Sequence, residues 1–368
     1  MKKRIVGIDL ARIIAMFMIM NYHILMYGSW MTSKQNSFDN KVFGEFAIAL
    51  TVISVDIFAM ISGYVGLYSR HRLSRLLDLW FQVIFYSWLV LGFFYFFRNN
   101  LLNQQLIIHN FFPTVFKGYW YWNGYIILFI LSPLISQGLK SITKKQFKTI
   151  IILLFALTSC LTINPHYDLF NLGLGYSGLW LIVLYVYGAY FKRFGIPKLL
   201  DNTLINIILL VFNLCLIVLC SYLFHHYNIW IDQNNFDTTQ IQYTFPLVVS
   251  LAILVFLLLL KVKIQSKVWD KIITFLGKKS FSAYLLQTNP LIFGFLITNN
   301  YNFLRNLSLG RMIFSLIVIA LLWYFGAIII DVVRSLIWNV LRINKLFTRI
   351  EIYWKGKKYD ATVDKNKL

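Results

Sequence analysis

Long apolar runs alternate with short polar segments along almost the whole chain. Each run is roughly 15 to 24 residues long, about the length that an α-helix needs to cross the hydrocarbon core of a bilayer. The runs cover residues 5–27, 45–68, 76–97, 119–139, 149–163, 176–191, 204–225, 244–260, 280–298 and 312–330. This pattern predicts an all-α integral membrane protein, a bundle of about ten transmembrane helices, in which the fifth and sixth runs are the shortest.

Basic residues between the runs predict the orientation of the bundle. With the N-terminus in the cytoplasm, the inner segments hold 28 of the 35 Lys and Arg residues, the outer segments hold six, and Arg12 lies inside the first run. Cytoplasmic segments of membrane proteins carry an excess of Lys and Arg, so both termini are predicted to be cytoplasmic. We expect one transmembrane domain over 1–350 and a short basic tail over 351–368, held near anionic headgroups.

Composition agrees with this class of protein. The chain has 368 residues, of which 59% are hydrophobic and only 13% charged, and its mean hydropathy of +0.66 lies outside the usual soluble range. The net charge of +21 would suggest nucleic acid as a partner of a soluble protein. Here orientation accounts for it, and we expect no nucleic-acid partner. The three cysteines fall in apolar runs at unpaired spacing, which predicts neither a disulfide framework nor a Cys-based metal site.

The first run contains a permanent cation and an imidazole, although a charge at that depth costs several kcal/mol. Arg12 and His23 are eleven residues apart, which is about 20° from three full helical turns, so they share one face at a separation of roughly 16 Å. Asp9 precedes Arg12 by three residues and can neutralise it. The face therefore consists of Asp9, Arg12, Met16, Ile19 and His23, and we expect it to point into the protein or an aqueous cavity.

A structural explanation of these residues stays open. Arg12 can snorkel to the inner interface beside Asp9, and His23 can be an interfacial histidine at the outer end of the run. Ionisable groups inside spans are functional by default, however, so a functional role is the working hypothesis.

The second run and the segment after it hold further charges. Asp56 lies inside the run, where an Arg or His elsewhere in the bundle is its natural partner. Arg72 and Arg75 follow on the inner side and, three residues apart on a helix, can face one phosphate-bearing ligand together. On spacing alone they are better explained as charges that only set the orientation.

Aromatic and polar side chains mark the fourth and ninth runs. Trp120 and Tyr121 open the fourth run and are typical of the aromatic belt at the outer interface. Tyr284 and Gln287 give the ninth run a polar beginning, and Pro290 predicts a kink. The chain has no Walker loop, dinucleotide fingerprint, HExxH or GxSxG motif, so no soluble catalytic machinery is appended.

Together these motifs resemble acyltransferase family 3, whose hallmark is an Arg, ten residues and a His in the first span, here Arg12 and His23. The stretch "GIDLARIIA" is similar to the family's Asp-x-x-Arg opening, and "VDIFAMISGY" to its second-span pattern. Arg72 and Arg75 match its Arg-x-x-Arg pair, and "WYWNGYIILFILSPLI" and "SFSAYLLQ" resemble two later segments. Many relatives have His where this chain has Gln287, so proton transfer there is in doubt, whereas a hydrogen bond to a substrate hydroxyl remains open.

The resemblance implies a multi-pass enzyme of the cell membrane. It would transfer an acyl group, most often acetyl from cytoplasmic acetyl-CoA, to a hydroxyl of a cell-surface or lipid-linked glycan, such as an exopolysaccharide or a wall polymer. The catalytic candidates are His23, Arg12, Asp9 and Asp56, the donor-binding candidates are Arg72 and Arg75, and the acceptor-binding candidates are Trp120, Tyr121, Tyr284 and Gln287. His23 would act as general base or carry the acyl group transiently.

Partners and rival functions follow from the same features. We expect the glycan acceptor, the bilayer and the polysaccharide biosynthesis machinery as partners, and no metal. A transporter or glycan flippase is the main alternative, because buried Arg, Asp and His also suit a translocation path. It would move substrate without consuming acyl-CoA and is often built from inverted repeats, which the sequence does not show. A membrane glycan polymerase would need a large outer loop, and none is predicted.

Overall fold

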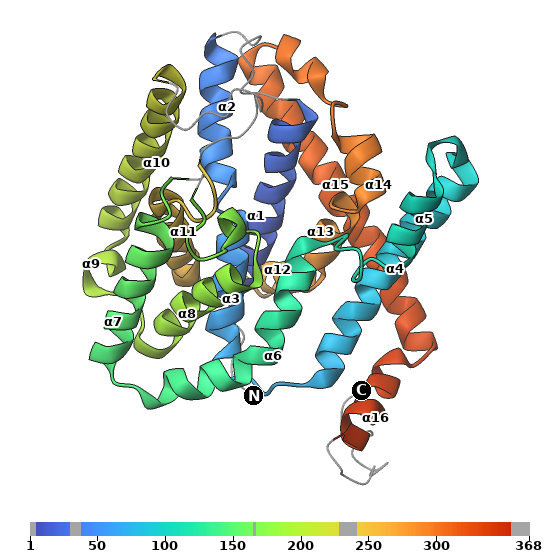
Figure 1. Cartoon of the computed structure of the whole chain (residues 1–368), viewed down its shortest axis with the longest axis horizontal. Helices are drawn as coiled ribbons and strands as arrows, with labels where there is room; N and C mark the ends of the chain where they lie inside the picture. The colour runs from blue at the N-terminus through green and yellow to red at the C-terminus, as the bar shows by residue number, and fades with distance from the viewer. Residues whose placement is uncertain (1–4, 30–37, 165–166, 228–240, 355–368) are drawn as a thin grey trace.

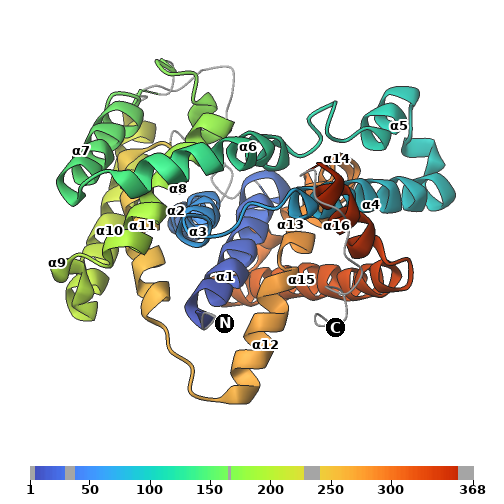
Figure 2. The ribbon, with the colours of Figure 1, turned by 90° about the horizontal axis from the view of Figure 1, so that it is seen from below.

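The computed structural model describes residues 5–29, 38–164, 167–227 and 241–354. Every regular element in those residues is a helix, and no strand occurs among them. Figures 1 and 2 show long helices lying side by side, with shorter helices near their ends. The prediction of an all-α protein is confirmed.

Six helical segments within the described residues are long and apolar enough to cross a membrane. They are Val6–Gly28, Val42–Gly66, Leu73–Phe97, Trp120–Ser141, Thr203–Phe224 and Leu309–Val340. A seventh arises if α13 (Phe281–Gln287) and the segment Pro290–Asn306, which is bent from it by 54°, form one broken span.

The predicted count of about ten spans is not confirmed. The three remaining apolar runs do form helices, but these are shorter than a full crossing. They are α7 (Lys144–Phe155), α8 (Gly178–Phe194) and α11 (Pro246–Lys261).

The other helices are assigned as follows. The first two spans hold α1 (Val6–His23), α2 (Phe38–Thr51) and α3 (Ser54–Gly66). The later spans are α4 (Leu73–Phe97), α6 (Trp120–Ser141), α10 (Thr203–His226) and α15 (Leu309–Val340). Short helices are α5 (Gln104–Phe111), α9 (Lys198–Asp201), α12 (Lys267–Lys279), α14 (Pro290–Ile292) and α16 (Ile343–Trp354). In the part of the chain that the structure describes, three turns are π-helical: Ile24–Gly28, Ala156–Cys160 and Phe293–Ile297.

Glycines allow α3 and α8 to pack with their backbones in contact. A Cβ atom at Gly63 would lie 1.9 Å from the carbonyl oxygen of Tyr185, and one at Gly188 would lie 1.9 Å from that of Met60. Small residues at such crossings are typical of helix packing in membranes, where close approach supplies most of the attraction.

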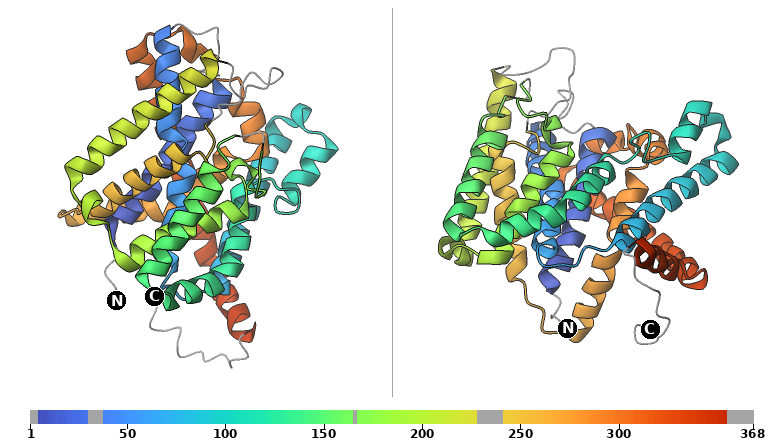
Figure 3. Two further views of the ribbon diagram at one scale, coloured as in Figure 1. Left: turned by 60° about the vertical axis from the view of Figure 1, so that its left-hand side comes forward. Right: turned by 60° about the horizontal axis from the view of Figure 1, so that its bottom comes forward.

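The N-terminal half of α1 is held in the same way, between α11 and α12. A Cβ atom at Gly7 would lie 2.2 Å from the carbonyl oxygen of Leu259 in α11. A Cβ atom at Gly277 in α12 would lie 2.8 Å from Cβ of Asp9. Figures 2 and 3 show the start of α1 beside α12. These contacts fix the position of Asp9 and of the residues that follow it.

Ion pairs and a polar contact tie the helices together near α12 and α16. Asp331 of α15 accepts from Lys279 Nζ at 2.8 Å and from Arg334 Nε at 2.6 Å, which joins the end of α12 to α15. Glu351 of α16 accepts from Ser74 Oγ of α4 at 2.6 Å. The helix α16 runs through Trp354, so the predicted tail begins inside a helix, and residues 355–368 lie outside the described residues.

The beginning of α1 and the helix α16 lie toward the same end of the molecule (Figure 1). This arrangement is the one that two termini on one side of the membrane would require. That the side is the cytoplasm stays a prediction from the loop charges.

The substitution Gly63→Ala is expected to weaken the contact between α3 and α8, because the new methyl group would overlap the Tyr185 carbonyl. Overpacking of this kind costs about 1–3 kcal/mol, so the thermal unfolding midpoint in detergent should fall. Gly92→Ala in α4 is the matched control, since a Cβ there meets no atom within 4 Å. Equal midpoints for the two variants would contradict the close crossing of α3 and α8.

Candidate active site

His23 is the last residue of α1, at the point where the α-helix passes into the π-helical turn Ile24–Gly28. It is buried, with 9% of its surface exposed. Its Nδ1 lies 3.1 Å from Oε1 of Gln287. The imidazole ring and the ring of Phe293 are in contact edge to face, with their centroids 5.2 Å apart. Single π-helical turns inside helices are frequently found at functional sites.

The Gln287 side chain determines the hydrogen-bonding state of His23. Nε2 of Gln287 donates to the carbonyl oxygen of Met20 at 3.3 Å, which directs Oε1 toward the imidazole. Because Oε1 can only accept, His23 Nδ1 must donate, so in the neutral imidazole the lone pair is on Nε2. Both ends of the Gln287 amide are thus engaged with α1, which the sequence did not indicate, and a hydrogen bond from Gln287 to a substrate hydroxyl stays a prediction.

A break between α13 and α14 places the Gln287 side chain beside His23. Gln287 is the last residue of α13, and Asn289 caps α14 by accepting from the Leu291 amide at 3.0 Å. Asn289 Nδ2 donates to Asn110 Oδ1 at 3.2 Å and to Tyr119 Oη at 3.0 Å. The kink predicted at Pro290 is confirmed. Irregular backbone at this depth needs such partners, because the bilayer offers none.

Arg12 lies near the other end of the same face of α1. Its Nη1 donates to Asp9 Oδ1 at 2.7 Å, which is the pairing that the spacing predicted. Asp9 is buried, whereas 24% of the Arg12 side chain is exposed. The guanidinium is therefore oriented by a buried carboxylate and remains accessible.

The exposed part of Arg12 lines a cavity of about 290 Å³, which we name the basic cavity. Its cationic and imidazole side chains are Arg12, Arg70, His71 and Arg75, and its hydroxyl side chains include Ser62, Ser69 and Ser132. A neighbouring cavity of about 390 Å³ shares Arg12 and Arg75 and adds Lys192. Clustered cations in a recess of this kind favour a ligand that carries several negative charges.

Sequence reasoning overlooked Arg70 and His71, although they stand beside the Arg pair in the stretch "RHRLSR". Ser132 Oγ donates to the carbonyl oxygen of Phe129 at 2.9 Å, so His71 Nδ1, 3.2 Å from Oγ, is the donor in the second bond. Burial lowers the pKa of His71 below its ordinary value, and the charges of Lys140 and Arg75 lower the pKa further. The ring is therefore neutral at neutral pH, and the arginines supply the positive charge.

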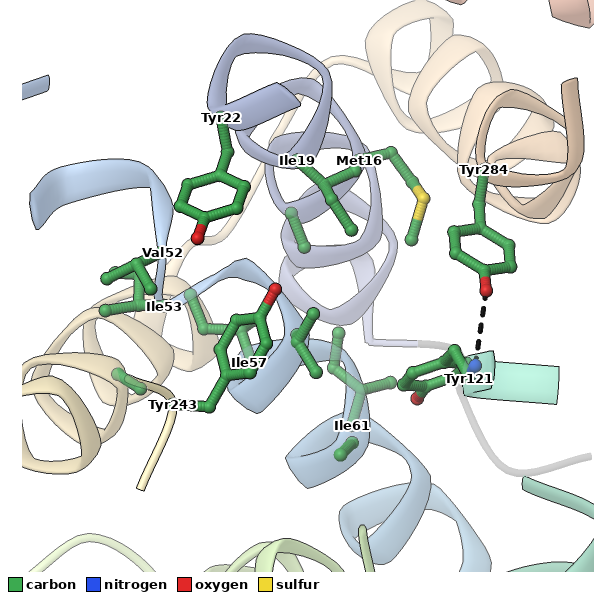
Figure 4. Close-up of a cluster of buried hydrophobic side chains, with 14 of the residues drawn as sticks. Met16, Ile19, Tyr22, Val52, Ile53, Ile57, Ile61, Tyr121, Tyr243 and Tyr284 are labelled. Atoms are coloured by element: carbon green, nitrogen blue, oxygen red, sulfur yellow. Dashed lines mark hydrogen bonds between the residues drawn. The ribbon is translucent and has the colours of Figure 1, made fainter. Parts of the chain in front are cut away.

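A third and much smaller space, a void of about 10 Å³, lies further along α1, and we name it the small void. It is lined by Ala15, Met16, Ile19, Ser54, Val55, Phe58, Tyr121, Phe281 and Tyr284. Phe58, Tyr121 and Phe281 also line the basic cavity, so the two spaces are neighbours. Figure 4 shows Met16 pointing toward Tyr284, whose Oη accepts from the Tyr121 amide at 3.3 Å.

The predicted face of α1 is therefore continuous. Arg12 lines the basic cavity, Met16 and Ile19 line the small void, and His23 follows Ile19 by one helical turn. The side chains between the two ionisable groups face space inside the bundle.

Asp56 does not have the partner that the sequence suggested. Its Oδ1 accepts from Trp180 Nε1 at 3.0 Å, and its Oδ2 is buried without a hydrogen-bond partner among the described residues. The expectation of an Arg or His partner was wrong, because α8 packs directly on α3 and brings a neutral indole N–H to the carboxylate. Asp56 is thus not a hydrogen-bond partner of Arg12 in this structure.

The structure also separates Arg72 from Arg75. The helix α4 begins at Leu73, and the backbone of Arg72 is extended, so the helical face assumed for the pair does not form. Both side chains are exposed, but Arg75 lines the basic cavity and Arg72 does not. Of the two predicted donor-binding residues, only Arg75 therefore borders this cavity.

Aromatic rings connect the predicted acceptor residues with His23. The ring centroid of Trp120 lies 4.8 Å from that of Tyr176 and 6.2 Å from that of Tyr243. Tyr243 lies 6.5 Å from Tyr22, which is 6.0 Å from His23. We name these four residues, Trp120, Tyr176, Tyr243 and Tyr22, the aromatic cluster. No single run of sequence links them, so only Trp120 was predicted.

The helices of the described residues enclose an ionisable site in a bundle with six segments that are long and apolar enough to cross a membrane, the architecture of a polytopic integral membrane protein. The chain belongs to acyltransferase family 3: the family model described as an acyltransferase domain matches residues 5–330, nearly the whole chain. It is thus a membrane acyltransferase, and the resemblance seen in the motifs is confirmed. No curated protein and no solved structure matches the chain. Among the described residues, no three His, Cys, Asp or Glu side chains are grouped as metal ligands.

Proposed function

We propose that the chain transfers an acyl group, in the simplest case acetyl, from cytoplasmic acyl-CoA to a hydroxyl of a cell-surface or lipid-linked glycan. One observation carries this proposal: a single face of α1 has Arg12 in the basic cavity at one end and a buried, hydrogen-bonded His23 at the other. The Arg12 end suits an anionic donor, and the His23 end suits an acceptor hydroxyl that must lose a proton.

The basic cavity is the proposed site of the donor. Arg12 and Arg75 line both adjoining cavities and Lys192 lines the second, and guanidinium groups suit the phosphates of CoA. The loop charges predict that this end faces the cytoplasm, where acyl-CoA is made, with the protein in the cell membrane. The long pantetheine arm would then extend along α1 toward His23.

His23 is the proposed general base. Its Nε2 takes the proton of the acceptor hydroxyl, and the hydroxyl oxygen attacks the thioester carbonyl carbon. The new C–O bond forms, the C–S bond breaks, and the CoA thiolate leaves with the proton returned from His23. Gln287 stabilises the imidazolium by accepting from Nδ1, much as the third member of a catalytic triad does.

The aromatic cluster is the proposed contact with the acceptor. Its rings follow one another from Tyr176 and Trp120 through Tyr243 to Tyr22, which lies beside His23, and Tyr176 is 40% exposed. Flat apolar ring faces with polar rims suit the faces of sugar rings. Association with polysaccharide biosynthesis machinery would supply such a glycan acceptor at the His23 end of α1.

Release of CoA by the purified protein, given acetyl-CoA and a glycan acceptor, tests this function. His23→Ala is expected to lower the acceptor-dependent rate by about 10²–10⁴-fold, the usual contribution of a general base. His109→Ala is the matched control, because His109 stacks on Phe116, outside the site. Full activity of a correctly inserted His23→Ala protein would refute the assignment, and glycan movement without CoA release would indicate a flippase instead.

The two arginines of the Arg-x-x-Arg pair are expected to differ. Arg75→Ala should raise the KM for acetyl-CoA about 10-fold, because hydrogen bonds to charged groups contribute about 1.5–3 kcal/mol. Arg72→Ala should leave KM unchanged, since this side chain is absent from the lining of the basic cavity. Steady-state kinetics of both variants decide the point, and an equal rise in KM would mean that both contact the donor.

Gln287→Leu is expected to lower kcat about 10- to 100-fold without changing the KM for the donor, because His23 would lose the partner that fixes its tautomer. Gln287→His should retain most activity, since a ring nitrogen can accept from Nδ1 in place of Oε1. The comparison separates orientation of His23 from simple packing. If both variants kept wild-type kcat, the bond between Gln287 and His23 would have no catalytic role.

A further inference from the structure

A further cavity of about 350 Å³ lies between α4 and α16, next to the two cavities of the proposed donor site. We name it the α16 groove, and it is lined by Ser74, Arg75, Asp78, Leu79, Asn344, Phe347 and Thr348. Arg75 lines this groove and both other cavities, and Leu79 lines the groove and the basic cavity. The three spaces therefore meet at one guanidinium group.

One stripe of α16 holds this helix against the beginning of α4 (Figures 1 and 2). The ring centroid of Phe347 lies 4.9 Å from that of Phe81, and Glu351 accepts from a serine hydroxyl of α4 at 2.6 Å. Asn344 and Thr348 lie on the same stripe, because the spacing within this set is three or four residues. Phe347 and Glu351 are buried, whereas Asn344 and Thr348 are exposed. The stripe is therefore packed at one end and open, with polar side chains, at the other.

The side chains of the α16 groove suit a neutral base that is joined to phosphate. Arg75 is the cationic residue of the lining. Asp78 accepts from Gln82 Nε2 at 2.9 Å and from Trp338 Nε1 at 3.1 Å, and its carboxylate disfavours a phosphate beside it. The side-chain amide of Asn344 offers a donor and an acceptor together, the pair that matches one edge of adenine. The phosphates of such a ligand belong at Arg75 and its base belongs at α16.

The size of CoA requires more space than the basic cavity provides. Sites for drug-sized ligands measure about 300–1,000 Å³, and CoA combines a pantetheine arm, phosphates and adenosine, whereas the basic cavity measures about 290 Å³. Arg12 of α1 lines the basic cavity and its neighbour, but the lining of the α16 groove contains no residue of α1. A donor whose arm follows α1 toward His23 therefore has its other end available to this groove.

We propose that the α16 groove binds the adenosine end of acyl-CoA, with Arg75 at the phosphates and Asn344 and Thr348 at the base. The donor then extends from α16 past Arg75 and through the basic cavity toward His23. This inference rests on the proposed function and specifies how its donor is recognised. The helix α16 follows the residues that the family model matches, so membership of the family does not by itself predict this contact.

Two donors that differ in the nucleotide test the groove in the purified full-length protein with a glycan acceptor. S-acetylpantetheine keeps the thioester and the pantetheine arm of acetyl-CoA but lacks the adenosine. Asn344→Ala is expected to raise the KM for acetyl-CoA about 3- to 10-fold, the range for one neutral hydrogen bond, and to leave the KM for S-acetylpantetheine unchanged. Thr348→Trp should raise the KM for acetyl-CoA at least as much, because the indole would fill the groove.

Asn339→Ala is the matched control for these variants. Asn339 is exposed, like Asn344, but it belongs to α15 and is absent from the lining of the groove. This variant should change neither KM. Because all three positions are exposed, the thermal unfolding midpoint in detergent should stay that of the wild type.

The outcomes separate the two proposals. A wild-type protein that releases thiol from neither donor, with the acceptor present, refutes the proposed function itself. A wild type that has the same KM for acetyl-CoA and S-acetylpantetheine overturns the adenosine site and leaves the proposed function standing. An equal rise in KM for both donors in the groove variants, or an unchanged KM for acetyl-CoA in both variants, also overturns the adenosine site alone.

Discussion

The contact of the α1 backbone with α11 and α12 determines how the rest of the site is built. Gly7 and Gly277 let the three helices approach until only hydrogen atoms fit between them, and Asp9 lies within that crossing. Because Asp9 is held there, it keeps Arg12 oriented toward the basic cavity. A charged pair is costly in a membrane unless its partners are fixed in the protein, and close packing provides that fixation.

Polar groups elsewhere in the bundle are also held by partners within the protein, and these partners come from distant parts of the chain. Gln287 reaches His23, Trp180 reaches Asp56, and Lys279 reaches Asp331. Each pair joins two helices, so polar contacts that serve the site also determine which helices are neighbours. Eight buried side-chain oxygens are exceptions among the described residues, and three of them, Ser54 Oγ, Asp56 Oδ2 and Tyr121 Oη, belong to predicted site residues or to the walls of the basic cavity and the small void. They mark where the structure retains hydrogen-bonding capacity that the protein itself does not use.

Local features of the site were predictable from the sequence, and long-range features were not. The shared face of Arg12 and His23 and the pairing of Asp9 with Arg12 follow from helical periodicity alone, and the structure contains both. The partner of Gln287 is 264 residues away, so no local spacing indicates it. The Arg72 prediction failed for a local reason, because it assumed a helix that begins only at Leu73. The number of crossings was uncertain because hydropathy does not distinguish a short or broken helix from a full span.

The π-helical turn after His23 affects where this segment can accept an inserted or deleted residue: before His23 or after it. A π turn holds one residue more than a regular α turn, and it begins at Ile24, so the interval from Arg12 to His23 keeps the regular α-helical period. One residue inserted inside that interval would rotate His23 by about 100° away from Gln287. One residue gained or lost after His23 would fall in a turn whose register is already irregular. The spacing of the motif is therefore strict on one side of the imidazole and adjustable on the other.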